Sequence, residues 1–301
     1  MVHNEWTVVT RDCSKIVVGI PTVGRSDTIV TTVRHTLLQT LRPDRVIVCG
    51  TNGTDVAGLH GLDGVEVITA ERGLPRQRNA ILRLVADCDV ILFLDDDFIM
   101  SPRYVETTLA AFAARPTLVA TTGDLLADGS RNAGYSVEEA EAIIRADGDP
   151  PRDGWEIAPH AYGCNMALRL ATVRDHDLRF DERLPLYAWS EDIDFTHRIG
   201  RHGEIAKLAG ARGVHLGTKS GRTSGYRLGY SQVANPIYLY GKGSYDFRRA
   251  AGSVGRNMAM NLARSAWPEP FVDRLGRLRG NAMALLDIVR GRLAPERILD
   301  L

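Results

Sequence analysis

Three consecutive carboxylates, Asp95, Asp96 and Asp97, directly follow the apolar run Val90–Leu94. A short apolar run of this kind is typical of a strand buried on both faces, and Asp is disfavoured within strands. We therefore expect the strand to end where the acids begin. Three like charges this close repel one another, and a hard cation with oxygen ligands would relieve that repulsion. The cluster predicts a metal site, with a solvated acidic loop as the alternative.

A second pair of carboxylates, Glu191 and Asp192, follows Ser190 and precedes apolar residues at helical spacing. With Ser190 as the N-cap, both acids would lie in the first helical turn, where the helix dipole favours negative charge in any protein. Trp189 just before the pair and the other acidic cluster favour a catalytic interpretation. A carboxylate held at a helix start can act as a general base.

His215 ends another apolar run and opens a loop of Gly, hydroxyl and basic residues that includes Lys219 and Arg222. Backbone N–H groups and two cations can bind a phosphate. The alternatives are a structural histidine and a mobile surface loop. Two other nucleotide folds are excluded by spacing, because the chain has no Walker A sequence before the acid-tipped strand and no G-x-G-x-x-G after the first strand.

The elements that would position these residues alternate between strand and helix over the first hundred residues, which predicts βαβ units and a parallel sheet. A polar segment is expected from 124 to 159, and the last eighty residues are expected to be helical. The predicted strands are 16–22, 45–49, 65–69, 90–94, 118–122, 162–168 and 206–214; the predicted helices are 28–40, capped by Ser26 or Asp27, then 76–86, 102–114 and 137–145.

Composition is that of an ordinary globular protein, with 301 residues, 44% hydrophobic and 25% charged. The formal net charge is zero, so no global basic field indicates nucleic acid. From Arg222 onward, thirteen Lys or Arg stand against six Asp or Glu, and such a basic tail can contact an anionic surface. The cysteines, 13, 49, 88 and 164, have no paired spacing and are interpreted as structural thiols of a reducing cytoplasm. Neither a signal peptide nor a spanning helix is apparent.

Five motifs in series resemble those of the family-two glycosyltransferases with a GT-A fold. GIPTVGR resembles the opening strand and loop, and RGLPRQRNAIL the start of the helix that contacts the donor. FLDDD resembles the metal-binding motif, GCNMALR the acceptor-side strand and WSEDIDF the E-D motif. The match covers roughly residues 15–225, and the tail resembles the C-terminal extensions of bacterial members.

The resemblance implies an α/β GT-A fold, with a Rossmann-like, mostly parallel sheet flanked by helices and a helical C-terminal extension. Residues 1–225 would be the catalytic domain, with 15–100 binding the nucleotide-sugar and 101–225 forming the acceptor side, and 226–301 would be the extension. It implies inverting transfer of a sugar from a nucleotide-diphosphate sugar to a hydroxyl of a glycan, glycolipid or small molecule, of the kind that builds bacterial polysaccharides.

Roles are implied residue by residue. Asp95, Asp97 and His215 would hold Mn²⁺ or Mg²⁺, Asp192 would be the catalytic base, and Glu191 and Trp189 would contact the acceptor. The donor contacts would be Pro21, Thr22, Val23, Gly24, Arg25, Asn52, Arg78, Asn79, Asp95, Asp96, Lys219 and Arg222. Many family members carry an acid after the second strand to read the base. Gly50 stands there in this chain, with Asn52 and Asp55 nearby, so the nucleobase stays open.

The expected partners are the nucleotide-diphosphate sugar and the hydroxyl acceptor, without nucleic acid. A cytoplasmic protein is expected, with peripheral contact to a membrane or lipid-linked acceptor through the basic tail, and homo-oligomerisation stays open. The alternatives are a nucleotidyltransferase, which a G-x-G-x-R loop after the first strand would favour, and a non-catalytic nucleotide- or glycan-binding protein.

Overall fold

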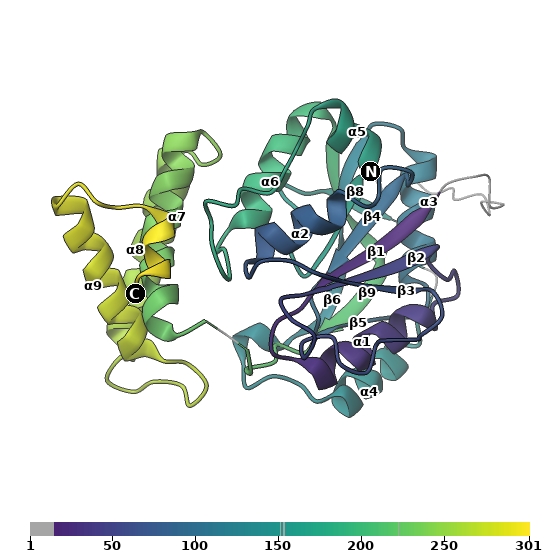
Figure 1. Ribbon diagram of the computed structural model, residues 1–301, viewed down its shortest axis with the longest axis horizontal. Coiled ribbons are helices and arrows are strands. Elements are labelled where there is room, and N and C mark those ends of the chain that lie inside the picture. The colour runs from purple at the N-terminus through teal and green to yellow at the C-terminus, as the bar shows by residue number, and fades with distance from the viewer. Residues whose placement is uncertain (1–14, 151, 153, 222) are drawn as a thin grey trace. The chain divides into compact units, whose positions relative to one another are not determined.

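A computed structural model describes residues 15–301 of the chain apart from 151, 153 and 222 (Figure 1). Its contacts divide it into two compact units. Unit 1 takes the described part of Met1–Arg72, together with Arg76–Arg179 and Phe195–Ser220. Unit 2 takes Gly73–Pro75, Phe180–Asp194 and the described part of Gly221–Leu301. Each unit has hydrophobic clusters of its own.

Unit 1 is built on one mixed sheet, in which the described residues form nine strands in the order β3-β2-β1-β4-β8-β6-β9-β5, with β7 paired to β9. The strands are β1 (Ile16–Pro21), β2 (Arg45–Gly50), β3 (Val65–Thr69), β4 (Val90–Leu94), β5 (Phe98–Met100), β6 (Leu118–Asp128), β7 (Trp155–Ile157), β8 (Asn165–Arg169) and β9 (Glu204–His215). The neighbours β3, β2, β1 and β4 run parallel, as the alternation of strand and helix predicts. β8 is antiparallel to both β4 and β6.

Apolar side chains hold helices α1 (Ser26–Leu37) and α3 (Tyr104–Ala114) on this sheet. Val18, Val48 and Leu92 of the central strands share one buried cluster with Ile29 and Val33 of α1. α1 and α4 lie along one side of the sheet in Figure 1, and α2 lies along the other. The helices are α1 (Ser26–Leu37), α2 (Leu74–Leu82), α3 (Tyr104–Ala114), α4 (Val137–Asp147), α5 (Leu170–Asp175) and α6 (Glu191–Ile199), with short 3₁₀ turns η1 (Gly129–Arg131) and η2 (Gly200–His202).

Several element boundaries differ from those expected. α1 begins at Ser26, so its N-cap is Arg25, without a side-chain cap, and not Ser26 or Asp27. α2 occupies 74–82 in place of 76–86, because Pro75 fits the first turn of a helix. The short strands β5 and β7 were not expected. β6 was expected to end at 122 but continues to Asp128, into the segment expected to be polar, since its pairing with β9 tolerates half-exposed residues and register shifts.

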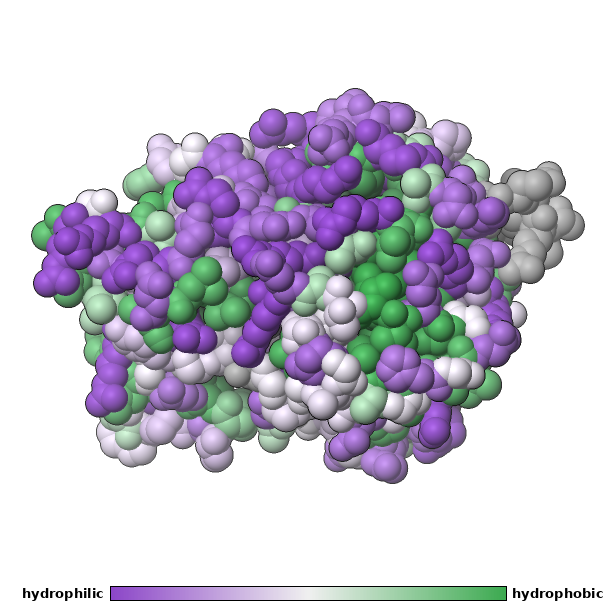
Figure 2. Space-filling view, in the orientation of Figure 1, coloured by the Kyte–Doolittle hydropathy of each residue, from purple (hydrophilic) through white to green (hydrophobic). Residues whose placement is uncertain are grey.

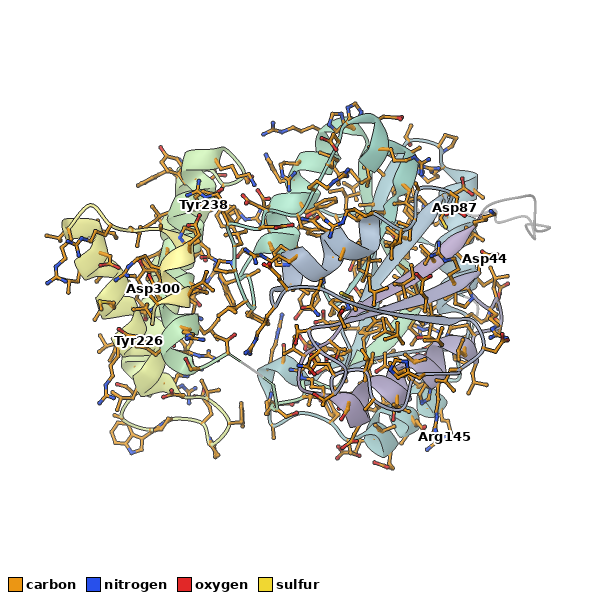
Figure 3. All side chains as sticks on the ribbon, in the orientation of Figure 1. Asp44, Asp87, Arg145, Tyr226, Tyr238 and Asp300 are labelled. Atoms are coloured by element: carbon orange, nitrogen blue, oxygen red, sulfur yellow. The ribbon has the colours of Figure 1, made fainter. Side chains whose placement is uncertain are left out.

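Unit 2 is mainly helical, as expected for the last eighty residues, with α7 (Gly225–Lys242), α8 (Phe247–Arg264), α9 (Arg274–Val289) and the 3₁₀ turn η3 (Pro295–Leu299). α7 and α9 pack closely at glycines. A Cβ on Gly280 of α9 would lie 2.0 Å from the carbonyl oxygen of Tyr226 on α7. Tyr226 and Tyr238 are labelled along α7 in Figure 3.

The segment 180–194 is held on α7 by polar contacts within unit 2. The hydroxyl of Tyr238 donates to Asp181 Oδ2 at 2.7 Å, and Asn235 Nδ2 donates to the carbonyl of Trp189 at 2.9 Å. The loop at the end of this segment is strained, because Leu186, Ala188 and Ser190 all have positive φ. The start of α6 therefore depends on α7 for its position.

Over the part of the chain that is described, no helix combines the length and apolar character needed to cross a membrane.

Candidate metal and nucleotide site

The acid cluster lies where β4 ends. All five residues of β4 are buried, and the strand stops at Leu94, directly before the carboxylates, as expected. β5 begins at Phe98, directly after the three carboxylates. It pairs antiparallel with β9, so that Phe98 lies opposite His215. This pairing brings the end of β9 to the acid cluster, and it is the structural reason why His215 and Asp97 lie side by side.

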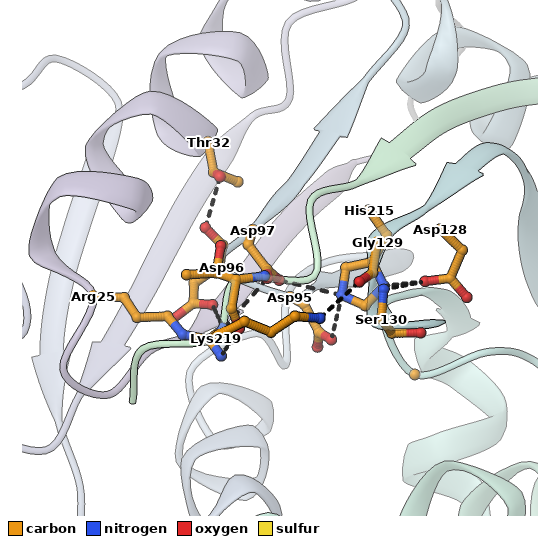
Figure 4. A network of polar contacts seen from close by, with 12 residues as sticks. Arg25, Thr32, Asp95, Asp96, Asp97, Asp128, Gly129, Ser130, His215 and Lys219 are labelled. Carbon is orange, nitrogen blue, oxygen red and sulfur yellow. Dashed lines mark hydrogen bonds and ion pairs between the residues drawn. The ribbon is translucent and has the colours of Figure 1, made fainter. Parts of the chain in front are cut away.

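Asp95, Asp97 and His215 form a cluster whose potential ligand atoms all lie within 4.8 Å of one another. His215 Nε2 lies 3.3 Å from Asp97 Oδ1 and 3.8 Å from Asp95 Oδ2 (Figure 4). The two carboxylates suit hard cations such as Mn²⁺ and Mg²⁺, and the imidazole favours Mn²⁺ of the two.

The other ring nitrogen of His215 is held by Asp128, the last residue of β6. Nδ1 lies 3.0 Å from Asp128 Oδ1, and because an ionised carboxylate only accepts, Nδ1 carries the hydrogen. Nε2 is thereby aimed at Asp95 and Asp97. Burial lowers the pKa of His215, but the hydrogen bond to Asp128 and the nearby charges of Asp97 and Asp95 outweigh it and raise the pKa to about 10. The site attracts positive charge.

Asp97 supplies a test of whether these residues fit a cation. Its side chain is 2% exposed, and Oδ1 has no hydrogen-bond partner among the described residues. Oδ2 accepts the N–H of Thr218 at 2.7 Å. Burial raises the pKa of Asp97, yet His215, Arg25 and Thr218 hold it well below its usual range, so the group is ionised. A buried, ionised oxygen without a donor, facing an imidazole nitrogen, fits a metal ligand.

Asp96 points away from this cluster toward the loop after β1. Its Oδ2 accepts from the Thr22 hydroxyl at 2.7 Å and its Oδ1 from Arg25 Nη1 at 2.6 Å. Burial and the neighbouring charge of Asp97 raise the pKa of Asp96 to about 6, against the opposing effect of Arg25. Both oxygens are therefore engaged in holding the 21–25 loop against the end of β4.

Arg25 also joins this loop to the segment that follows His215. Its Nε donates to the carbonyl of Ser220 at 2.8 Å and its Nη2 to the carbonyl of Thr218 at 3.1 Å. Lys219 Nζ donates to the carbonyl of Gly129 at 2.8 Å, and Figure 4 shows Lys219 beside the acid cluster. Arg222, expected to bind phosphate, lies outside the described residues.

The remaining residues that the sequence predicts to contact a donor lie near the carboxyl ends of the parallel strands. Arg78 is fully buried, donates to the carbonyl of Gly163 at 2.7 Å and lies 3.6 Å from Asp95 Oδ1. Asn79 is buried beside it in α2. Pro21 and Thr22 are buried at the end of β1, and Val23 and Gly24 are more open. Asn52 Oδ1 accepts the N–H of Thr54, so this side chain stabilises its own turn.

Glu191 and Asp192 begin α6 as predicted, within unit 2. Glu191 is buried, and the carbonyl of Trp189 accepts from Asn235. Asp194, two residues after Asp192, is fully buried. Its carboxylate accepts from Lys242 Nζ at 2.8 Å and from Ser244 Oγ at 2.5 Å. The proximity of Asp192 to the Asp95 cluster stays a prediction.

Two supporting residues, Asp128 and Gln77, were not singled out by the sequence analysis, and a third, Asp55, was noted only as lying near the position expected to read the nucleobase. Asp128 was missed because it stands in a polar stretch without motif. Gln77 bridges the ends of β1 and β2 by donating to the carbonyls of Thr22 and Cys49, and Asp55 Oδ1 accepts the N–H of Gly24 at 2.8 Å. Gln77 could have been found, since it directly precedes Arg78 and Asn79 in the same motif.

The model for the family described as glycosyl transferase family 2 matches residues 17–174, more than half of the chain. This match covers β1 to α5 and so includes the end of β4. No curated protein sequence matches the chain significantly.

Solved structures resemble the fold. GalNAc-T7, crystallised with UDP, GalNAc and Mn²⁺, is 13% identical with a TM-score of 0.55; the match covers 87% of this chain and 59% of that one. Mannosyltransferase PcManGT from Pyrobaculum calidifontis, with GDP-Man and Mn²⁺, is 15% identical with a TM-score of 0.56, covering 98% and 88%. TarS 1–349 from S. aureus is 17% identical with a TM-score of 0.51, covering 83% and 72%. At such identities the likeness establishes the fold, which is the GT-A fold.

Proposed function

The chain belongs to glycosyl transferase family 2, and on that premise we propose that it moves a sugar from a nucleotide-diphosphate sugar to a hydroxyl group, with inversion and with help from a divalent cation. The observation that carries the proposal is the Asp95–Asp97–His215 cluster at the carboxyl end of β4, beside the loop after β1. In open α/β sheets, ligands bind outside the carboxyl ends of the strands.

The donor would lie along the ends of β1, β2 and β4. The loop 21–25, Asn52, and the buried Arg78 and Asn79 would contact the nucleotide and sugar, together with Asp95 and Asp96. Lys219 and Arg222 would approach the diphosphate. Arg25 supports this arrangement, because it already links the loop after β1 to the carbonyls of Thr218 and Ser220. The two loops can therefore respond together when an anionic ligand arrives.

Asp95, Asp97 and His215 would hold Mn²⁺ or Mg²⁺. When bound there, such an ion supplies Lewis acidity that stabilises the negative charge of the leaving diphosphate. The resemblance to structures crystallised with Mn²⁺ supports this choice of ion. Asp128 supports His215 as a ligand by fixing the hydrogen on Nδ1 and leaving Nε2 to coordinate.

Asp192 would act as the general base. An acceptor hydroxyl is a poor nucleophile, and removal of its proton by a positioned carboxylate is worth about 10²–10⁴ in rate. The acceptor oxygen forms a bond to the anomeric carbon as the bond to the diphosphate breaks, and the proton passes to Asp192. One displacement of this kind inverts the anomeric centre. Glu191 and Trp189 would contact the acceptor.

The proposed division at residue 225 separates a catalytic domain from a helical extension. Segment 180–194 packs with the C-terminal helices in unit 2, so the proposed catalytic part relies on the extension for support.

A cytoplasmic location with peripheral membrane contact is also proposed. Cys49, Cys88 and Cys164 are buried and free, which supports a reducing compartment. Association into a homo-oligomer stays open.

The function is tested first by thermal shift with UDP-, GDP-, dTDP- and CDP-sugars, each with and without Mn²⁺. We expect one nucleotide series to raise the melting temperature, and more so with the cation. Sugar transfer from that donor is then followed for the wild type, for Asp97→Asn and for Asp124→Asn, whose carboxylate forms an exposed ion pair with Lys207. Transfer should be lost only in Asp97→Asn, and undiminished transfer in that variant would refute the metal site.

A further inference from the structure

Helix α9 presents two different faces. Its buried residues, Gly280, Asn281, Ala284 and Asp287, pack toward the other helices of unit 2. The opposite face carries an apolar stripe, defined as Leu275, Leu278, Ala282, Leu285, Leu286 and Val289. Leu275, Leu278, Ala282, Leu285 and Val289 recur at intervals of three and four residues, and Leu286 lies four residues after Ala282, so all six side chains fall on one side of the helix.

Apart from the half-buried Leu278, the apolar stripe is open to solvent. Leu275 is 50% exposed and Val289 is 85% exposed, and Leu285 and Leu286 are also exposed. Eleven of the sixteen exposed large apolar or aromatic side chains in the described chain lie from Tyr240 to Leu299. They include Trp267, 82% exposed in the connection between α8 and α9. In Figure 2, hydrophobic residues reach the surface among hydrophilic ones where α9 lies, at the left of the view. An apolar concentration of this kind marks an interaction surface.

The charge around the stripe is positive. Arg279 lies beside it on α9, and Arg290 and Arg292 follow its end; all three are exposed, and no ion pair to another described residue is found for them. The single carboxylate within α9, Asp287, is buried against Tyr230 and Arg297. The neighbouring α8 contains four arginines and no acid. A partner that covers the stripe should therefore offer both an apolar surface and negative charges.

Two partners could cover such a stripe, and the charges distinguish between them. In a second copy of the chain, the same arginines would meet without an exposed carboxylate of α9 to pair with them, and like charges across an interface are unfavourable. An anionic bilayer offers negative headgroups to the arginines and an acyl boundary to the leucines, and Trp is favoured at that boundary.

We propose that the apolar stripe of α9, with Arg279, Arg290, Arg292 and Trp267, docks the protein on a bilayer that contains anionic lipid, with the helix lying in the plane of the interface. This assigns the peripheral contact expected from the basic tail to one helix face. The surface is independent of sugar transfer, since it takes no residue from the cluster at β4.

The test is sedimentation of the full chain with sucrose-loaded vesicles, without donor or acceptor, so that the result does not depend on whether sugar is transferred. Vesicles of phosphatidylcholine alone are compared with vesicles that also contain phosphatidylglycerol. We expect binding to the anionic vesicles that weakens with salt, and much weaker binding to the neutral ones. The variants Arg279→Gln and Arg290→Gln should each weaken it by about fivefold.

The stripe itself is tested by the double variant Leu275→Gln/Leu286→Gln, which should weaken binding by roughly tenfold or more. The matched control is Leu38→Gln/Leu84→Gln, at two exposed leucines of unit 1; it should bind as the wild type does. Because all four side chains are exposed, melting temperatures should be alike. Absent binding, equal binding to neutral vesicles, or equal loss in the control would overturn the proposal. So would a concentration-dependent dimer that the stripe variant abolishes.

Discussion

Lys242 Nζ lies 2.8 Å from Asp194 Oδ2, and thereby joins the C-terminal end of α7 to the start of α6. Asp194 is fully buried, and Lys242 also contacts Asp181 Oδ2 at 2.6 Å. The proposed base, Asp192, stands two residues before this buried carboxylate. The extension therefore helps to hold the start of α6, where the proposed base lies.

Lys242→Met should destabilise the protein by roughly 3 kcal/mol, because it removes the positive charge that Lys242 places 2.8 Å from the buried carboxylate of Asp194. Urea unfolding measures the change. Lys207→Met is the matched control, since Lys207 pairs with Asp124 where both side chains are more than a third exposed, and such pairs contribute less than about 1 kcal/mol. Equal losses in the two variants would mean that the Lys242–Asp194 contact adds nothing beyond a surface ion pair.

Acidification should act on the same network through Asp181. Burial raises the pKa of Asp181, but the hydrogen bonds from Lys242 and Tyr238 outweigh it and hold the pKa below its ordinary value. Its stabilisation is therefore complete above the unfolded value of about 3.9 and is lost as the pH falls through the lower folded value. Asp181→Asn should be less stable than the wild type at neutral pH. The difference in the free energy of unfolding between the two proteins, measured by urea titration, should become smaller below pH ~4. A gap that stays constant with pH would contradict an ionic role.

Asp128→Asn should weaken Mn²⁺ binding by about 10–100-fold, since the residue that orients a ligating histidine is worth that much. Titration calorimetry of the donor-free protein measures this directly. Asp124→Asn, on the same strand but paired with the exposed Lys207, should bind Mn²⁺ as the wild type does. If Asp128→Asn binds equally well, His215 does not coordinate in the tautomer described.

Gly280→Ala should destabilise unit 2 by about 1–3 kcal/mol or more, because the new methyl group would lie 2.0 Å from the carbonyl oxygen of Tyr226 and 2.7 Å from the amide of Tyr230. Gly252→Ala in α8 is the control. It has no atom within 4 Å of its Cβ position, so it should raise stability by about 0.5–1 kcal/mol through helix propensity. The melting temperature should therefore fall in Gly280→Ala and rise in Gly252→Ala. A shift in the same direction in both variants would argue against the close crossing of α7 and α9.

The local chemistry of the acid cluster was predictable from the sequence. The apolar run Val90–Leu94 is followed directly by Asp95, and the strand was expected to stop there because Asp is disfavoured within strands. The first four strands were likewise predictable, because apolar runs alternate with amphipathic ones. The motifs added the family, which the match over residues 17–174 confirms.

Tertiary structure alone decided which distant groups support that cluster. Asp128 looked like one acid in a polar stretch, and it became the partner of His215 only because β6 and β9 pair in register at their ends. Arg25 likewise reached Thr218 and Ser220 through the fold. Local sequence patterns predict which residues of a strand or helix are buried. Pairing across almost ninety residues depends on how the elements meet, and the chain carries no local periodicity that encodes it.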